Sequence, residues 1–173
     1  MSTITNTAPV QTSGRGLLKA ILWATLIAGT LDIISAIVIS GAVSGTFAPI
    51  RLLQGIAYGA VGKSAFEGGL GMALVGLLFH YCFALIFATV FFLLYPVLPI
   101  LQRNAVLWGM VYGVVAWSIM NGLVIPLSHI GPVPFLWWKA LVNIVILMYA
   151  IGIPIALIAR KYYSRKRLNT VEG

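Results

Sequence analysis

Asp32 and His80 are the two ionisable side chains that lie well inside long apolar runs of this sequence. A charge at the centre of a membrane-spanning helix costs about 2.5–3.5 kcal/mol on insertion scales, so such residues usually have a specific role there. A carboxylate and an imidazole that meet inside a membrane can bind a proton or a polar solute. These two residues are therefore the first candidates for a functional site.

Three further polar residues lie within apolar runs at a similar depth, namely Asn121, Lys139 and Asn143. At a rise of 1.5 Å per helical residue, all five polar groups fall near the midplane or in the same half of the predicted spans. The sequence thus predicts one interior polar cluster with five members: Asp32, His80, Asn121, Lys139 and Asn143.

The sequence offers little other chemistry. It has no paired carboxylates, no Ser-His-Asp set, no phosphate-binding glycine loop and no HExxH motif. His80 and Cys82 are two residues apart and so point to different sides of a helix, and a single cysteine excludes an intramolecular disulfide. We expect no catalytic residues, no bound metal and no cofactor.

The composition indicates a membrane protein. Of the 173 residues, 61% are hydrophobic and only 8% are charged, and the mean hydropathy is +1.03. A soluble domain has about a quarter of its residues charged, so this chain could not cover a water-exposed surface. The net charge of +8 comes mainly from basic residues near the ends of the apolar runs and not from a basic, aromatic-lined groove, so nucleic acid is not an expected partner.

Four apolar runs are long enough to cross a bilayer as helices, at about residues 17–40, 68–95, 105–125 and 135–159. The predicted fold is an all-α, polytopic membrane protein with four transmembrane helices, because these runs are continuous and do not alternate as the strands of a β-barrel would. Pro126 is expected to end the third helix, and Gly152 and Pro154 to kink the fourth. Residues 15–163 form this single domain, between a flexible polar N-terminal tail (1–14) and a basic cytoplasmic C-terminal tail (164–173).

The link between the first two spans has helical spacing over residues 49–62, and it begins at Pro49, which suits a first helical turn. This segment is too short to cross a bilayer, so we predict a short re-entrant or interfacial helix. A structured loop that caps the bundle is the alternative.

The basic residues predict the orientation. With four spans, both chain ends lie on one side of the membrane. That side carries eight of the 11 Lys and Arg residues: Arg15, Lys19, Arg103, Arg160, Lys161, Arg165, Lys166 and Arg167. Because basic loops favour the cytoplasm, both termini are predicted to be cytoplasmic.

Small residues share helix faces with the polar ones. Asp32 lies in a four-residue repeat with Ala24, Ala28 and Ala36, whereas branched aliphatic residues lie on the opposite side of the first span. His80 lies on a similar small-residue face of the second span, and the third span carries a GxxxG pair. Small residues let helices approach closely, so both ionisable side chains are predicted to face neighbouring helices.

Two explanations of the polar cluster stay open at this stage. As structural contacts, its hydrogen bonds would each stabilise the bundle by about 0.6 kcal/mol on average. As a functional site, Asp32 and His80 would bind a proton or a solute, and an aspartate is a costly choice for packing alone. Lys139 is either a counter-ion of Asp32 or an interfacial anchor beside Trp137 and Trp138, and His80 is either a neutral hydrogen-bonded imidazole or a switch.

The second half of the chain resembles a known family. Residues 79–167 contain "HYCFALIFATVFFLLYPVLP", a short link into "LWGMVYGVV", then "NGLVIPLSH" and a basic end. This pattern is similar to the YagU-like group of small, uncharacterised bacterial inner-membrane proteins. The resemblance implies a location in a bacterial plasma (inner) membrane, and it carries over no activity and no site residues.

These observations predict a multi-pass integral membrane protein that is a non-enzymatic membrane component with a buried polar cluster. The alternative is a small proton-coupled transporter or channel that uses Asp32 and His80, although four spans are few for a carrier unless the chain oligomerises. A lipid-modifying enzyme is the third candidate, and it lacks an evident nucleophile and base. The expected partners are the lipid bilayer and, in a homo-oligomer, further copies of the chain.

Overall fold

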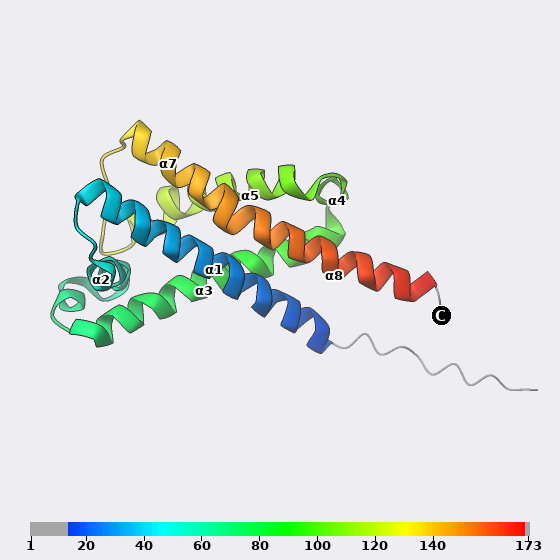
Figure 1. The fold of residues 1–173 in the computed structure, drawn as a ribbon, viewed down its shortest axis with the longest axis horizontal. Helices are drawn as coiled ribbons and strands as arrows, with labels where there is room; N and C mark the ends of the chain where they lie inside the picture. The colour runs from blue at the N-terminus through cyan, green and yellow to red at the C-terminus, as the bar shows by residue number, and fades with distance from the viewer. Residues whose placement is uncertain (1–13, 172–173) are drawn as a thin grey trace, which may run out of the picture.

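The apolar runs of the sequence form long helices that lie side by side (Figure 1). The computed structural model describes residues 14–171, and the side chains of residues 14–164. Four helical stretches are long and apolar enough to cross a membrane: Gly14–Ser44, Gly69–Val97, Ala105–Leu127 and Trp137–Ser164. No strand occurs among the described residues, so the all-α, polytopic fold predicted from the sequence is confirmed.

The first two stretches are the single helices α1 (Gly14–Ser44) and α3 (Gly69–Val97). The third runs from α5 (Ala105–Ile119) through a π-helical turn (Met120–Val124) into α6 (Ile125–Leu127), and the fourth from α7 (Trp137–Leu147) through a second π-helical turn (Met148–Gly152) into α8 (Ile153–Val171). A short helix, α4 (Ile100–Arg103), joins α3 to α5.

The two predicted tails differ in outcome. Residues 1–13 of the predicted N-terminal tail lie outside the described residues, and Gly14 is the first residue of α1. The segment predicted as a C-terminal tail is largely helical, because α8 continues to Val171. The first turn of α1, the last turn of α8 and α4 lie at one end of the bundle, as expected for an even number of spans (Figure 1).

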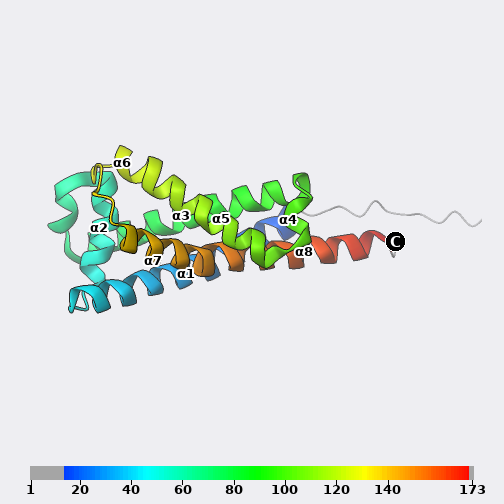
Figure 2. The same ribbon diagram turned by 90° about the horizontal axis from the view of Figure 1, so that it is seen from above.

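At the opposite end of the bundle, α2 (Pro49–Val61) lies across the long helices, which confirms a helix in the link (Figure 2). Pro49 lies in its first turn, where its missing N–H costs nothing. α2 packs directly on α3, because a Cβ added at Gly76 would collide with the backbone carbonyl of Leu53. The Gln54 side chain donates a hydrogen bond of 2.9 Å to the Gly69 carbonyl. Gly76 lies about 10 Å along α3 from its first residue, Gly69, so α2 crosses α3 about two helical turns from the end of the bundle.

The buried core fills the half of the bundle away from α2. Its members come from all four long stretches and include Ala24, Ala28, Phe87, Ala88, Phe91, Phe92, Tyr112, Ala116, Ile155 and Ala156. The Tyr112 hydroxyl donates to the Phe87 carbonyl (2.7 Å) and thereby ties α5 to α3. Gly109 and Gly113, the predicted GxxxG pair, let α5 approach the fourth stretch, because a Cβ at either glycine would meet its backbone at Gly152 or Met148. This half of the bundle is therefore closely packed.

Candidate functional site

Asp32 on α1 and His80 on α3 lie next to each other, as predicted. The distance from His80 Nδ1 to Asp32 Oδ2 is 4.0 Å, and the two side chains are only 11% and 21% exposed, respectively. The other ring nitrogen, His80 Nε2, donates to the backbone carbonyl of Gly29 at 2.8 Å. The imidazole therefore joins α1 to α3 and presents its second nitrogen to the carboxylate.

The contacts around this pair explain why the two helices meet here. A Cβ added at Gly29 would lie 2.8 Å from Cε1 of Tyr81, so the glycine gives this ring its place against α1. The Tyr81 hydroxyl is 2.8 Å from the hydroxyl of Thr30, and one of the two donates to the other. Gly29 and Thr30 thus fix the α1–α3 contact beside Asp32 and His80.

The hydrogen bond to Gly29 also fixes which ring nitrogen of His80 carries a hydrogen. A carbonyl oxygen only accepts hydrogen bonds, so Nε2 of His80 must carry the hydrogen that faces Gly29. A neutral ring then turns the lone pair of Nδ1 toward the Asp32 carboxyl group. At 4.0 Å this contact is longer than a hydrogen bond, so His80 supplies no donor to the carboxyl group.

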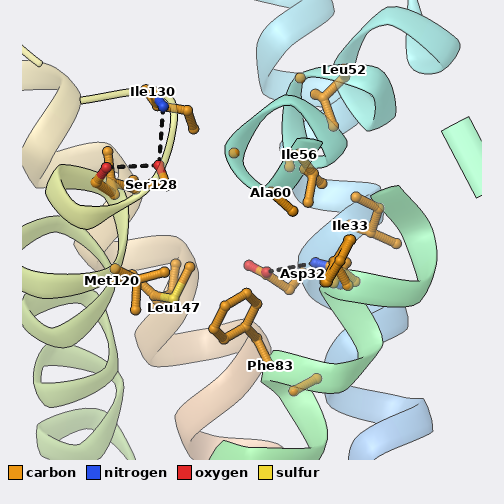
Figure 3. A pocket seen from close by; sticks show the side chains of 18 of the residues that line it. Asp32, Ile33, Leu52, Ile56, Ala60, Phe83, Met120, Ser128, Ile130 and Leu147 are labelled. Atoms are coloured by element: carbon orange, nitrogen blue, oxygen red, sulfur yellow. Dashed lines mark hydrogen bonds and ion pairs between the residues drawn. The ribbon is translucent and has the colours of Figure 1, made fainter. Parts of the chain in front are cut away.

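Asp32 and His80 form part of the wall of a cavity of about 440 Å³. Its other walls come from α2, α3, both π-helical turns, α6 and the loop after α6, and they are mostly apolar. Figure 3 shows the Asp32 carboxylate in the open space, with Ala60 of α2 above it and Phe83 of α3 below it. The lining contains one further polar side chain, Ser128. Its hydroxyl donates to the Ile125 carbonyl (2.7 Å) and accepts from the Ile130 N–H (3.1 Å). Both hydrogen bonds are thus made to backbone groups of the adjacent turn.

α2 and the loop after α6 are bonded to each other and together form the wall of the cavity at the α2 end of the bundle. The His129 backbone N–H donates to the carbonyl of Gly59 on α2 at 2.9 Å, and the His129 ring packs on Gly62. Phe87 lines the cavity on the side of the buried core. Its ring packs edge to face on the Tyr112 ring, with 6.4 Å between the ring centroids. The cavity therefore lies at the α2 end of the bundle, above the closely packed half.

A second cavity, of about 410 Å³, lies between α1 and α7 and reaches the same carboxylate. Asp32, Ala36, Leu52 and Leu147 line both cavities. Of the predicted cluster, Lys139 and Asn143 line only this second cavity, both as exposed residues.

Lys139 contacts the neighbouring Trp138 ring. Its ammonium group lies 5.3 Å from the ring centroid of Trp138, a cation–π contact near the start of α7. Among the described residues, the one basic side chain within 4.0 Å of the Asp32 carboxylate is His80, so Lys139 is not the paired counter-ion of Asp32. The role of Lys139 as an interfacial anchor stays a prediction, and its contact with Trp138 is compatible with it.

Asn121 does not belong to the cluster, and its predicted interior position is wrong. Its side chain is exposed and donates to the Trp117 carbonyl, four residues earlier in its own helix (3.0 Å). At 100° per residue, Asn121 is about 80° around the helix from Gly113. The amide thus donates within its own helix and not to a neighbouring one.

The aromatic residues of the site were not predicted from the sequence. Phe79, Phe83 and Phe87 repeat every four residues on α3, and all three line the first cavity beside His80. Their spacing next to the histidine was a visible signal. The cavity itself was not predictable, because it depends on where α2 and the loop after α6 lie.

Comparison of the chain with protein-family models, curated proteins and solved structures gave no match. The similarity to the YagU-like group therefore stays a prediction. The four long apolar helices are compatible with a membrane protein, and the site must be interpreted from its own geometry.

Proposed function

We propose that this protein is a multi-pass integral membrane protein that binds a small amphipathic molecule in the first cavity. One observation carries the proposal: a 440 Å³ space with mostly apolar walls contains a single carboxylate–imidazole pair. Cavities of about 300–1,000 Å³ with apolar walls and a few polar groups are typical of small-molecule sites. The polar pair would orient the ligand, and the apolar walls would hold its body.

We also propose that the protein is not an enzyme. Support comes from the lining of the cavity, where Asp32 and His80 are joined by no further acid, base or nucleophile apart from the engaged hydroxyl of Ser128. Binding and orientation are what this set of groups can do, whereas bond cleavage would need a positioned nucleophile or activated water.

For location, we propose the inner membrane of a bacterium with both termini in the cytoplasm. The distribution of Lys and Arg supports this orientation, since eight of the 11 belong to the end of the bundle that holds α4 and the chain ends. Both cavities would then lie in the outer half of the membrane.

Transport is the second candidate, and one observation favours it. Both cavities share Asp32, and neither is lined by residues of α1 before Asp32, of α3 after Phe87 or of α8. A site near the middle of the bundle that is closed toward one side has the form of one state of an alternating-access carrier.

The proposed function is tested by filling the cavity. The neutral fluorophore 1-aminoanthracene, whose emission rises in apolar sites, is titrated onto the protein in phosphatidylcholine nanodiscs, with empty nanodiscs as background. We expect saturable binding by the wild-type protein and its loss in Ala60→Phe, because the added ring occupies the space that Ala60 faces. Val61→Phe is the matched control, since Val61 is the next residue of α2 and does not line the cavity. No saturable binding by the wild type, or equal binding by Ala60→Phe, would refute the proposal.

A further inference from the structure

We propose that the ligand of the first cavity is an organic cation, with its ammonium group on Asp32 and its apolar body along Phe79, Phe83 and Phe87. This inference rests on the proposed function and names the chemical class of the molecule bound. It follows from three properties of the cavity: its charge, the arrangement of its rings and the absence of a competing cation.

The carboxylate of Asp32 is available to a ligand. Within the described part of the chain it accepts no hydrogen bond, and its one polar neighbour, Nδ1 of His80, is 4.0 Å away. The other ring nitrogen of His80 is bonded to the Gly29 carbonyl. Figure 3 shows the carboxylate directed into the cavity and not toward a helix. A cation placed there would gain a hydrogen-bonding or ionic partner that the protein itself does not supply.

Three aromatic side chains line the same cavity as this group. Phe79, Phe83 and Phe87 follow one another at four-residue intervals on α3, a distance of about 12 Å from first to last. The faces of aromatic rings attract ammonium groups, and the same rings pack against alkyl or aryl groups. A carboxylate with adjacent rings is the combination that recognises an amine or a quaternary ammonium group on an apolar skeleton.

The charges of the lining argue against an anion. Among the described residues, no lysine or arginine lines the first cavity, and Lys139 faces the second. An anionic headgroup would meet the Asp32 carboxylate without a compensating cation. A neutral apolar molecule could occupy the space, and it would leave the carboxylate unpaired.

The test uses two probes of equal shape. One is 4-phenylbutyl-trimethylammonium, and the other is its neutral isostere with carbon in place of nitrogen. Binding to the protein in phosphatidylcholine nanodiscs is measured by equilibrium dialysis after subtraction of empty nanodiscs. We expect the cation to bind at least about tenfold more tightly than the isostere, because it alone pairs with a desolvated carboxylate.

Two variants locate the effect. Asp32→Asn should remove the preference for the cation and leave the affinity for the isostere unchanged. Phe83→Leu should lower the affinity for the cation by about threefold or more. This second variant keeps the inference testable if Asp32→Asn does not fold. Asn143→Ala, on the second cavity only, is the control and should bind both probes as the wild type does.

The outcomes separate the two proposals. Equal binding of both probes, with no effect of Asp32→Asn, would overturn the cation assignment and leave the binding function standing. If the isostere, the cation and 1-aminoanthracene all fail to bind the folded wild-type protein, both the cation assignment and the proposed function are wrong.

Discussion

Gly29, Thr30 and Asp32 lie within four residues of one another on α1, and each meets α3 differently. Gly29 supplies space for Tyr81 and a carbonyl for His80, and Thr30 shares a hydrogen bond with Tyr81. Asp32 makes no hydrogen bond of this kind. At the scale of single residues, the two explanations of the polar cluster therefore divide between its members: His80 holds the helices together, and Asp32 is free for a ligand.

This division predicts unequal effects on stability. His80→Leu removes the bond from Nε2 to the Gly29 carbonyl and should lower the free energy of unfolding by about 0.6–1.7 kcal/mol, the range for hydrogen bonds between membrane helices. Asp32→Asn removes no hydrogen bond and should change it by less than about 0.5 kcal/mol. Both values are measured by unfolding in mixed micelles with increasing dodecyl sulfate. A larger loss for Asp32→Asn than for His80→Leu would show that the carboxylate, and not the imidazole, is the structural contact.

The sequence located Asp32 and His80 correctly because small residues repeat on their helix faces, and such stripes report helix contacts directly. It misplaced Asn121, since an amide can bond to its own helix and then faces outward whatever the surrounding pattern. For Lys139 and Asn143 the sequence predicted only a depth, and depth does not say which of two cavities a side chain lines.

At the scale of elements, the two π-helical turns share a sequence pattern. Each begins at a methionine and is followed by Ile-Pro, in "MNGLVIP" and "MYAIGIP". In both, the isoleucine N–H bonds to the methionine carbonyl five residues earlier, at Ile125–Met120 and Ile153–Met148. Proline removes the next N–H, which makes the regular ladder incomplete at this point. The sequence predicted a helix end and a kink from these prolines, and not the extra residue that each turn accommodates.

The position of α2 depends on one glycine of α3. Gly76→Ala would place a methyl group on the Leu53 carbonyl, force α2 away from α3 and weaken the bond from Gln54 to Gly69. We expect a loss of about 1–3 kcal/mol in the free energy of unfolding, as for other overpacked sites. Gly71→Ala, on the same helix but facing open space, should lie within about 0.5 kcal/mol of the wild type. Equal stability of the two variants in the same micelle assay would mean that α2 does not pack here.

The sequence predicted α2 as a helix and left its placement open, for a physical reason. Its apolar spacing and Pro49 are local signals, whereas its contact with α3 pairs a carbonyl with a distant glycine. Residues that accept a close backbone neighbour are recognised only when that neighbour is known. The cavity below α2 was unpredictable for the same reason.

At the scale of the whole molecule, the bundle has a packed half and a half that contains both cavities. The packed half is closed by buried alanines and aromatic rings, among them Phe91 and Phe92. The other half is roofed by α2 and the loop that carries His129. Asp32 therefore lies in the half that contains the cavities, and the opposite half is closely packed.

The proposed orientation can be measured by single-cysteine labelling. Cys82 is replaced by serine, and one cysteine is introduced at Glu67, near α2, or at Ile100 on α4. In intact bacterial cells, a membrane-impermeant maleimide should label Glu67→Cys, because the α2 end is proposed to lie outside. Ile100→Cys should be labelled only after permeabilisation. The reverse pattern would place the chain ends outside the cell.

The proposed site requires that Asp32 faces a cavity inside the bundle and not the surrounding lipid. Ala36 lies one turn from Asp32 and lines both cavities, whereas Val38 is 50% exposed on the outer side of α1 at nearly the same depth. The most direct measurement is the reaction rate of a small, charged methanethiosulfonate with Ala36→Cys and Val38→Cys, in protein that lacks Cys82 and is embedded in nanodiscs. We predict that Ala36→Cys reacts at least about tenfold faster, since the charged reagent can reach a thiol that faces the cavity beside Asp32 and cannot reach one that faces lipid. A rate at Val38→Cys equal to or above that at Ala36→Cys would contradict the account.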